Sequence, residues 1–116
     1  MRLVSSLLPV RRAGLLGAAA LAASLIGAPA LAQGIEATMN KAGCLACHTV
    51  DKKLVGPAYK DVAAKYKGKP EMVATLSAKV RKGGQGVWGP VPMPPTGPDK
   101  ISDADLKSAI EWVLSR

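Results

Sequence analysis

The residues of this sequence that are best suited to chemistry lie in one short motif. The stretch GCLACH, residues 43–48, contains both cysteines and the only histidine of the 116-residue chain. Two thiols three residues apart, followed at once by an imidazole, suit four kinds of site: a covalent haem attachment, a dithiol redox site, a zinc half-site or a structural disulfide. The rest of the sequence has to decide among them.

Three of these sites are disfavoured by the sequence around the motif. A structural zinc ion takes four Cys or His ligands, whereas the chain has three such residues, and adjacent Cys47 and His48 are poorly disposed to chelate one tetrahedral ion. A thioredoxin-like dithiol opens a helix that follows a strand, and no strand pattern precedes Cys44. A disulfide between Cys44 and Cys47 would close a tiny loop and would constrain the unfolded chain very little.

A covalently attached haem fits the motif best. Residues i and i+3 share a helical face, so Cys44 and Cys47 can form thioether bonds to the two vinyl groups of a haem. His48, the next residue, can swing to the iron. The sequence therefore predicts one haem c per chain, with His48 as an iron ligand.

The second axial ligand is predicted to be a methionine, because no second histidine exists and a thioether is the strongest remaining donor. Met39 lies just before the cysteines, on the same side of the haem as His48. Met72 belongs to an apolar helical pattern and is expected in the core. Met93 stands in PVPMPP, where prolines can fix a loop against the opposite haem face. We predict Met93 as the ligand, with loop packing as its alternative role.

The first 32 residues have the three-part layout of a secretory signal peptide. A basic segment, MRLVSSLLPVRR, precedes an apolar one, and Ala30-Leu31-Ala32 forms a small-residue cleavage pattern. The apolar stretch is long enough to raise the alternative of a membrane anchor, but its Ala and Gly content and Pro29 favour cleavage. We therefore expect an exported, periplasmic protein without stable membrane insertion, whose single domain spans residues 33–116.

The mature part is predicted to be all-α. Apolar residues recur at helical spacing in four segments, and no run alternates with the period of two that marks a strand. Helices are expected from about Ile35 toward the cysteines, over residues 58–66 after the Gly56-Pro57 break, from Pro70 to the Gly83-Gly84 stop, and after Ser102, which can cap the last helix, to the C-terminus. Residues 83–100 contain five Gly and five Pro and are expected to form an ordered, functional loop.

The charge of the mature chain indicates the class of its partner. Arg2, Arg11 and Arg12 would leave with the signal, so 13 Lys and Arg would face 8 Asp and Glu, a formal charge of +5. A cationic surface speeds encounter with an acidic partner, and Lys52, Lys53 or Lys60 could flank the haem edge. A nucleic acid is not expected, because the lysines are dispersed and the chain has only two Trp, two Tyr and no Phe.

With these motifs in view, the mature chain resembles the class I c-type cytochromes. It is most similar to the small bacterial monohaem cytochromes c that donate electrons to nitrite reductase or terminal oxidases. The likeness covers nearly all of residues 34–116 and is carried by KAGCLACHTVDKKLVGPAYKDVAAKY, GGQGVWGPVPMPP and AIEWVLS. The resemblance implies four or five helices around one haem, with Cys44 and Cys47 as anchors and His48 and Met93 as iron ligands.

The resemblance also implies roles around the ligands. The carbonyl of Pro57 would accept the other imidazole proton of His48, and Trp88 would donate its indole N–H to a haem propionate, with a buried filler as its alternative role. A propionate-contacting basic residue of relatives falls at Lys79. The chain departs from close relatives in having Thr96 where they have Asn, followed by an extra GPDK, so the resemblance does not extend to the fine tuning of the iron's potential.

The predicted function is one-electron transfer by a monomeric carrier, not an enzyme. Two filled axial positions leave no room for oxygen or peroxide at the iron. The partners expected are redox proteins such as nitrite reductase, a terminal oxidase or an upstream quinol-oxidising cytochrome. The alternatives are a haem enzyme or gas sensor with an open iron site, and a dithiol oxidoreductase without haem.

Overall fold

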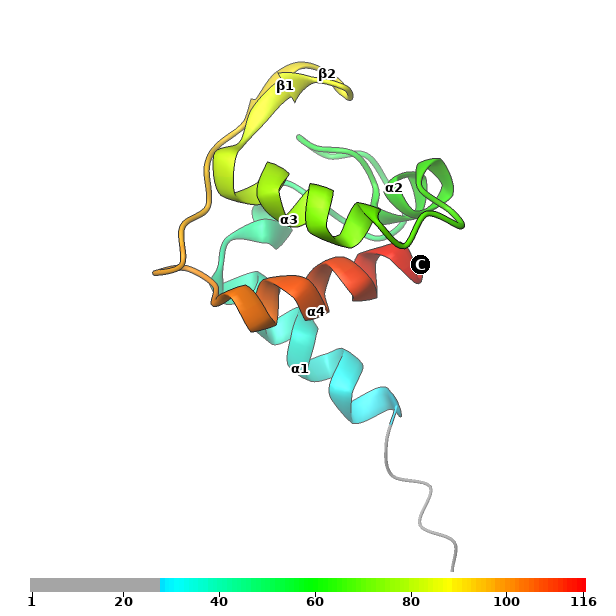
Figure 1. The fold of residues 1–116 in the computed structure, drawn as a ribbon, viewed down its shortest axis with the longest axis vertical. Coiled ribbons are helices and arrows are strands. Elements are labelled where there is room, and N and C mark those ends of the chain that lie inside the picture. Colours follow the sequence, from blue (N-terminus) through cyan, green and yellow to red (C-terminus); the bar gives the residue numbers. More distant parts are fainter. Residues whose placement is uncertain (1–27) are drawn as a thin grey trace, which may run out of the picture.

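The described part of the chain is mostly helical. The computed structural model describes the backbone of residues 28–116 and the side chains from residue 34 onward. Its elements, in chain order, are α1 (Ala28–Lys41), the 3-10 helix η1 (Cys44–Ala46), α2 (Tyr59–Lys65), α3 (Met72–Lys82), β1 (Gly84–Gly86), β2 (Gly89–Met93) and α4 (Asp103–Leu114) (Figure 1). The predicted all-α class is confirmed for the four helices, to which a small antiparallel sheet is added.

The helix ends follow local capping signals. Ser102 precedes α4, and its hydroxyl oxygen accepts a hydrogen bond from the backbone N–H of Asp105 at 3.1 Å, as the sequence predicts. The start of α1 differs from the prediction, because the helix begins at Ala28 rather than near Ile35. The expected cleavage point after Ala32 therefore falls inside α1, while residues 1–27 of the expected signal peptide lie outside the described residues.

The segment expected to be a loop without regular structure contains a β-hairpin. Strands β1 and β2 pair antiparallel with Gly84 opposite Met93 and Gly86 opposite Gly89, and an irregularity lies between the two pairs. These strands consist largely of Gly and Pro, and most of their residues are exposed. Because no alternate face is buried, the sequence carries no period-two signal, which explains why the prediction missed the hairpin.

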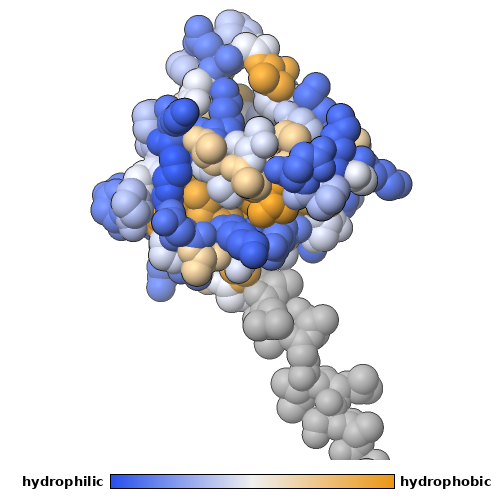
Figure 2. All heavy atoms as spheres, viewed as in Figure 1, coloured by the Kyte–Doolittle hydropathy of each residue, from blue (hydrophilic) through white to orange (hydrophobic). Residues whose placement is uncertain are grey.

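The core is organised around α4, which packs against α1, α2 and α3 (Figure 1). Five of its residues are buried: Leu106, Ala109, Ile110, Trp112 and Val113. Helix α3 contributes no buried residue, and its apolar side chains Val73, Leu76 and Val80 are only partly covered. Figure 2 shows apolar atoms gathered at the centre of one face, surrounded by hydrophilic residues. None of the helices in the described range has the length and apolar character needed to cross a membrane.

Candidate cofactor site

The reactive motif is placed by a turn between α1 and η1. Gly43 has a φ of 86°, which glycine adopts without steric cost, and it redirects the chain at the end of α1. The backbone N–H groups of Cys47 and His48 then donate to the carbonyl of Cys44, at 3.2 and 3.0 Å. Both thiols are free and half-buried, and burial raises the pKa of the Cys44 thiol, which favours its protonated form.

The imidazole of His48 is held from three sides. Its Nδ1 lies 2.8 Å from the carbonyl oxygen of Pro57, and because a carbonyl can only accept, Nδ1 carries the proton. The ring stacks on Tyr59, with centroids 5.1 Å apart and planes 16° apart. Gly56 covers another side, where a Cβ would collide with the ring atoms. This arrangement leaves Nε2 as the nitrogen with a free lone pair.

An apolar cavity of about 310 Å³ lies next to the motif. Its walls come from the 3-10 helix, the residues around Gly56, α2, α3, the hairpin and α4. The wall at the motif contains Cys44, Cys47 and His48, and the wall formed by α3 contains Leu76 and Val80. The apolar stripe of α3, only partly covered by protein, therefore faces this space.

The methionine predicted as a ligand also lines the cavity. Met93 is the last residue of β2 and is half-buried. The described residues contain two further methionines, and both reach the same cavity. Met39 is 2% exposed and belongs to the buried core, whereas Met72 is half-buried at the first position of α3 and not in the core as predicted. The cavity lining alone therefore does not distinguish which of the three methionine sulfurs is the predicted ligand.

Trp88 and Lys79 lie at the hairpin side of the cavity. Trp88 is 38% exposed in the turn between β1 and β2, so it is not the buried filler that was its alternative role. The Nζ of Lys65 lies 5.4 Å from the centroid of the Trp88 ring, within the range of a cation–π contact. A Cβ at Gly84 would come within 2.7 Å of the Nζ of Lys79, so the missing side chain makes room for this ammonium group.

The chemistry of the lining is not that of an acid–base or zinc site. No Asp or Glu of the described chain lines the cavity. From residue 34 onward, no group of three His, Cys, Asp or Glu side chains could hold a metal ion. The tyrosine at the site, Tyr59, has a pKa raised above its ordinary value, mainly because it is buried, and so stays neutral. What remains is a largely apolar space with two thiols, one oriented imidazole and thioether sulfurs, lined also by Lys53 and Lys79.

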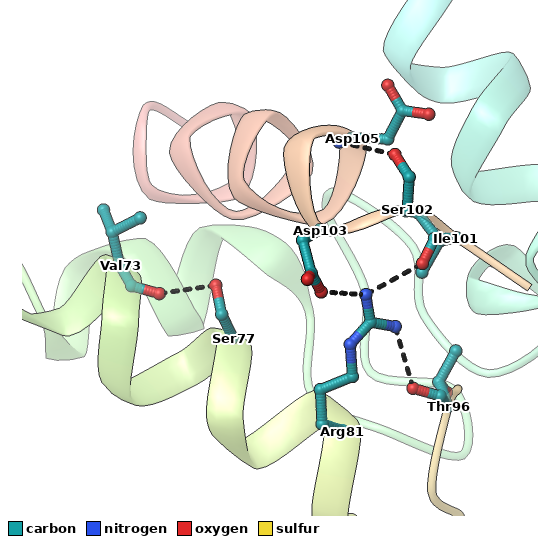
Figure 3. A network of polar contacts seen from close by, with 8 residues as sticks. All are labelled: Val73, Ser77, Arg81, Thr96, Ile101, Ser102, Asp103 and Asp105. Carbon is teal, nitrogen blue, oxygen red and sulfur yellow. Dashed lines mark hydrogen bonds and ion pairs between the residues drawn. The ribbon is translucent and has the colours of Figure 1, made fainter. Parts of the chain in front are cut away.

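Three residues that sequence reasoning missed support this site. Gly56 and Tyr59 enclose His48, and the available signal was the stretch GPAY, in which the sequence predicts a helix break and the resemblance implies a role for Pro57 alone. Arg81 lies at the end of α3 and donates to the carbonyls of Thr96 and Ile101 and to the carboxylate of Asp103 (Figure 3). No short-range sequence pattern predicts these contacts of Arg81, because the three partners lie 15 to 22 residues away along the chain.

Comparison with known proteins decides the family. The family model of cytochrome c matches residues 31–116. The chain belongs to the cytochrome c family. This cytochrome c is 45% identical to cytochrome c-551 of Pseudomonas aeruginosa over 93 residues, which cover 80% of this chain and 86% of that protein. It is 44% identical to cytochrome c-552 of Nitrosomonas europaea over 94 residues, which cover 81% of this chain and 89% of that protein.

The fold of this cytochrome c is similar to that of a solved relative. The crystal structure of wild-type Nitrosomonas europaea cytochrome c552 superposes with a TM-score of 0.63 at 45% identity. The match covers 69% of this chain and 96% of that one. The resemblance to small bacterial class I cytochromes, inferred from the motifs, is thereby confirmed.

Family membership establishes a covalently bound haem c and an electron-transfer function, not an enzymatic one. The residues of this chain fit that group. Cys44 and Cys47 supply the two thiols, the hydrogen bond to Pro57 leaves Nε2 of His48 able to bind iron, and the cavity walls are apolar. The half-covered stripe of α3 is the surface that a large apolar cofactor would bury.

Proposed function

We propose that this cytochrome c is a periplasmic one-electron carrier whose haem, attached through Cys44 and Cys47, has His48 and Met93 as axial ligands. The observation that carries the proposal is that His48 and Met93 line one apolar cavity, with Nδ1 of His48 already bonded to the Pro57 carbonyl. When bound, the haem iron supplies the one-electron oxidation and reduction. The chain supplies the two ligands, orients them, and surrounds the haem with apolar side chains that exclude water.

The two ligands have different tasks. His48 is fixed in its tautomer and ring plane by the Pro57 carbonyl and by stacking on Tyr59, so its Nε2 meets the iron without reorganisation. Met93 offers a neutral thioether, which stabilises the ferrous state more than a second imidazole would. Together they would hold the iron from both faces of the haem, and the apolar walls would keep water away, which would raise the reduction potential.

Trp88 and Lys79 suit the polar end of a haem. A propionate carboxylate accepts hydrogen bonds, and the indole N–H of Trp88 and the ammonium of Lys79 are donors beside the same cavity. We assign both residues to the propionates. Lys79 provides one cationic point charge there, without the planar fork of an arginine.

The rim of the cavity supports brief docking with a redox partner. Val55, Val87 and Val91 line the cavity and are 50%, 57% and 59% exposed. Lys52 and Lys53 are exposed next to Val55 along the chain, whereas Lys60 forms an ion pair with Asp51. A small apolar centre flanked by lysines suits an acidic partner that binds and leaves quickly.

The partners proposed are nitrite reductase, a terminal oxidase or a quinol-oxidising cytochrome, met by a monomer in the periplasm. Residues 1–32 are proposed to direct export and to be removed, leaving the domain of residues 33–116. Mass spectrometry of the purified periplasmic protein tests this proposal. A mature chain that begins at Gln33 supports it, and a retained N-terminal segment contradicts it.

The ligand assignment is tested by comparing Met93→Ala with Met72→Ala in the haem-loaded protein. A sulfur-to-iron charge-transfer band in the parent protein supports methionine ligation, and Met93→Ala is expected to abolish it while Met72→Ala retains it. Met39→Leu, which nearly conserves volume, is the control for the third sulfur. If Met72→Ala loses the band and Met93→Ala keeps it, the assignment is wrong. High-spin iron in the parent would instead favour an enzyme or gas sensor.

A further inference from the structure

The chain that follows Met93 lies against the last turn of α3. The backbone N–H of Thr96 donates to the carbonyl of Val80 at 2.9 Å. Gly83 is buried, and a Cβ there would collide with the carbonyl of Met93 and with the Pro94-Pro95 backbone. The backbone position of Met93 therefore depends on its pairing with Gly84 and on how firmly residues 94–96 are held on the end of α3.

Arg81 holds this segment at both ends. One terminal nitrogen of its guanidinium donates to the Thr96 carbonyl at 3.1 Å, and the other donates to the Ile101 carbonyl at 2.9 Å (Figure 3). The second nitrogen also contacts a carboxylate oxygen of Asp103 at 2.7 Å. Arg81 thus joins α3, the segment after Met93 and the start of α4.

The carbonyl contacts are the important part of this arrangement. The side chain of Asp103 is 91% exposed, so water and salt weaken its ion pair with the guanidinium. The Arg81 side chain is only 21% exposed, and its bonds to Thr96 and Ile101 are partly buried. A planar guanidinium can donate to several acceptors in fixed directions, whereas a lysine at this position would serve them poorly.

We propose that Arg81 is a positioning residue for Met93: by fixing the chain from Thr96 to Ile101 it holds the methionine sulfur against the haem iron. The inference rests on the proposed ligation by Met93. Without this clamp the segment would leave the end of α3 more often, and the sulfur would leave the iron with it. A ligand from solution would then compete more successfully for the vacated position, because the population of the open state sets its apparent affinity.

The experiment compares Arg81→Met and Arg81→Lys with Arg116→Met in the haem-loaded ferric protein. Arg116 is a matched control because its replacement removes the same charge, while its bonds, at 3.1 and 3.0 Å, go to the Trp112 carbonyl and the Ser115 hydroxyl at the end of α4. Two quantities are measured: the affinity for added imidazole, and the temperature at which the charge-transfer band disappears relative to the loss of helical circular dichroism.

Arg81→Met is expected to bind imidazole about tenfold more tightly than the parent, which corresponds to about 1.4 kcal/mol. Its charge-transfer band should vanish below the temperature at which the helices melt. For Arg81→Lys, the imidazole affinity and the temperature at which the band is lost should lie between those of Arg81→Met and the parent. For Arg116→Met, both quantities should match those of the parent. If both Arg81 variants keep the parent's imidazole affinity and lose band and helices together, Arg81 only stabilises the fold, and the inference is wrong. A parent protein that lacks the band, or a Met93→Ala protein that keeps it, overturns the ligation by Met93 itself, so the two failures are distinguishable.

Discussion

One added methyl group at Gly56 tests whether His48 must occupy its observed place. A Cβ at this position would collide with Cε1 of the imidazole and would lie 2.9 Å from both Nδ1 and Nε2. The ring cannot retreat freely, because it stacks on Tyr59, which is itself only 5% exposed. Overpacking costs about 1–3 kcal/mol and a lost hydrogen bond to Pro57 about 0.5–1.5 kcal/mol. Gly56→Ala should therefore lower the free energy of unfolding by about 2–4 kcal/mol.

The assay is guanidinium unfolding of the haem-loaded protein, followed by circular dichroism. Gly34→Ala is the matched control, since a Cβ there meets nothing within 4 Å and the residue lies within α1. That control should be unchanged or more stable by up to about 1 kcal/mol, because Ala favours a helix over Gly. If Gly56→Ala unfolds within about 0.5 kcal/mol of the parent, the range of ordinary surface substitutions, the reasoning about the His48 pocket is refuted.

Three further outcomes are expected. Replacing Cys44 and Cys47 together with Ala should leave mostly unfolded apoprotein by circular dichroism, because the haem completes the core, and a cooperatively folded haem-free variant would contradict this. Ser102→Ala should destabilise the protein by about 1 kcal/mol in thermal unfolding, because the cap on the Asp105 N–H is lost, and an unchanged midpoint would argue against the cap. Electron-transfer rates with an acidic redox partner should fall as salt is raised, and a flat profile would indicate apolar docking alone.

The sequence predicted well those features that depend on neighbouring residues. The cap at Ser102 and the stop of α3 before Gly83 are local signals, and both occur as expected. The spacing of Cys44 and Cys47 likewise fixes the attachment motif without reference to the rest of the fold. The start of α1 was predicted too late, because the helical spacing of apolar residues was followed from Ile35 and the preceding residues resemble the end of a signal peptide.

Features that join distant segments were not predictable in the same way. The hairpin that carries Trp88 pairs through the backbone of three glycines and Met93, and its strands are rich in Gly and Pro, which leave no periodic pattern. The contact of His48 with the Pro57 carbonyl was expected only from the family resemblance, since a carbonyl acceptor has no sequence signature. The contacts of Arg81 were not predicted for a similar reason: two of its three acceptors are backbone carbonyls, 15 and 20 residues away along the chain.

That choice of acceptors has an evolutionary consequence. Carbonyl oxygens are present whatever the side chain, so replacements at Thr96 and Ile101 leave the acceptors of Arg81 in place, provided that the backbone path is kept. The segment between them includes a turn, Pro98 to Lys100, that accepts no hydrogen bond from the guanidinium. Mutations can therefore accumulate in this turn without disturbing the clamp, whereas a single change at Arg81 removes it. The exposed side chains of Pro98 to Lys100 are accordingly where natural variants can diverge, as long as the backbone N–H groups of Lys100 and Ile101 keep their bonds to the Gly97 carbonyl.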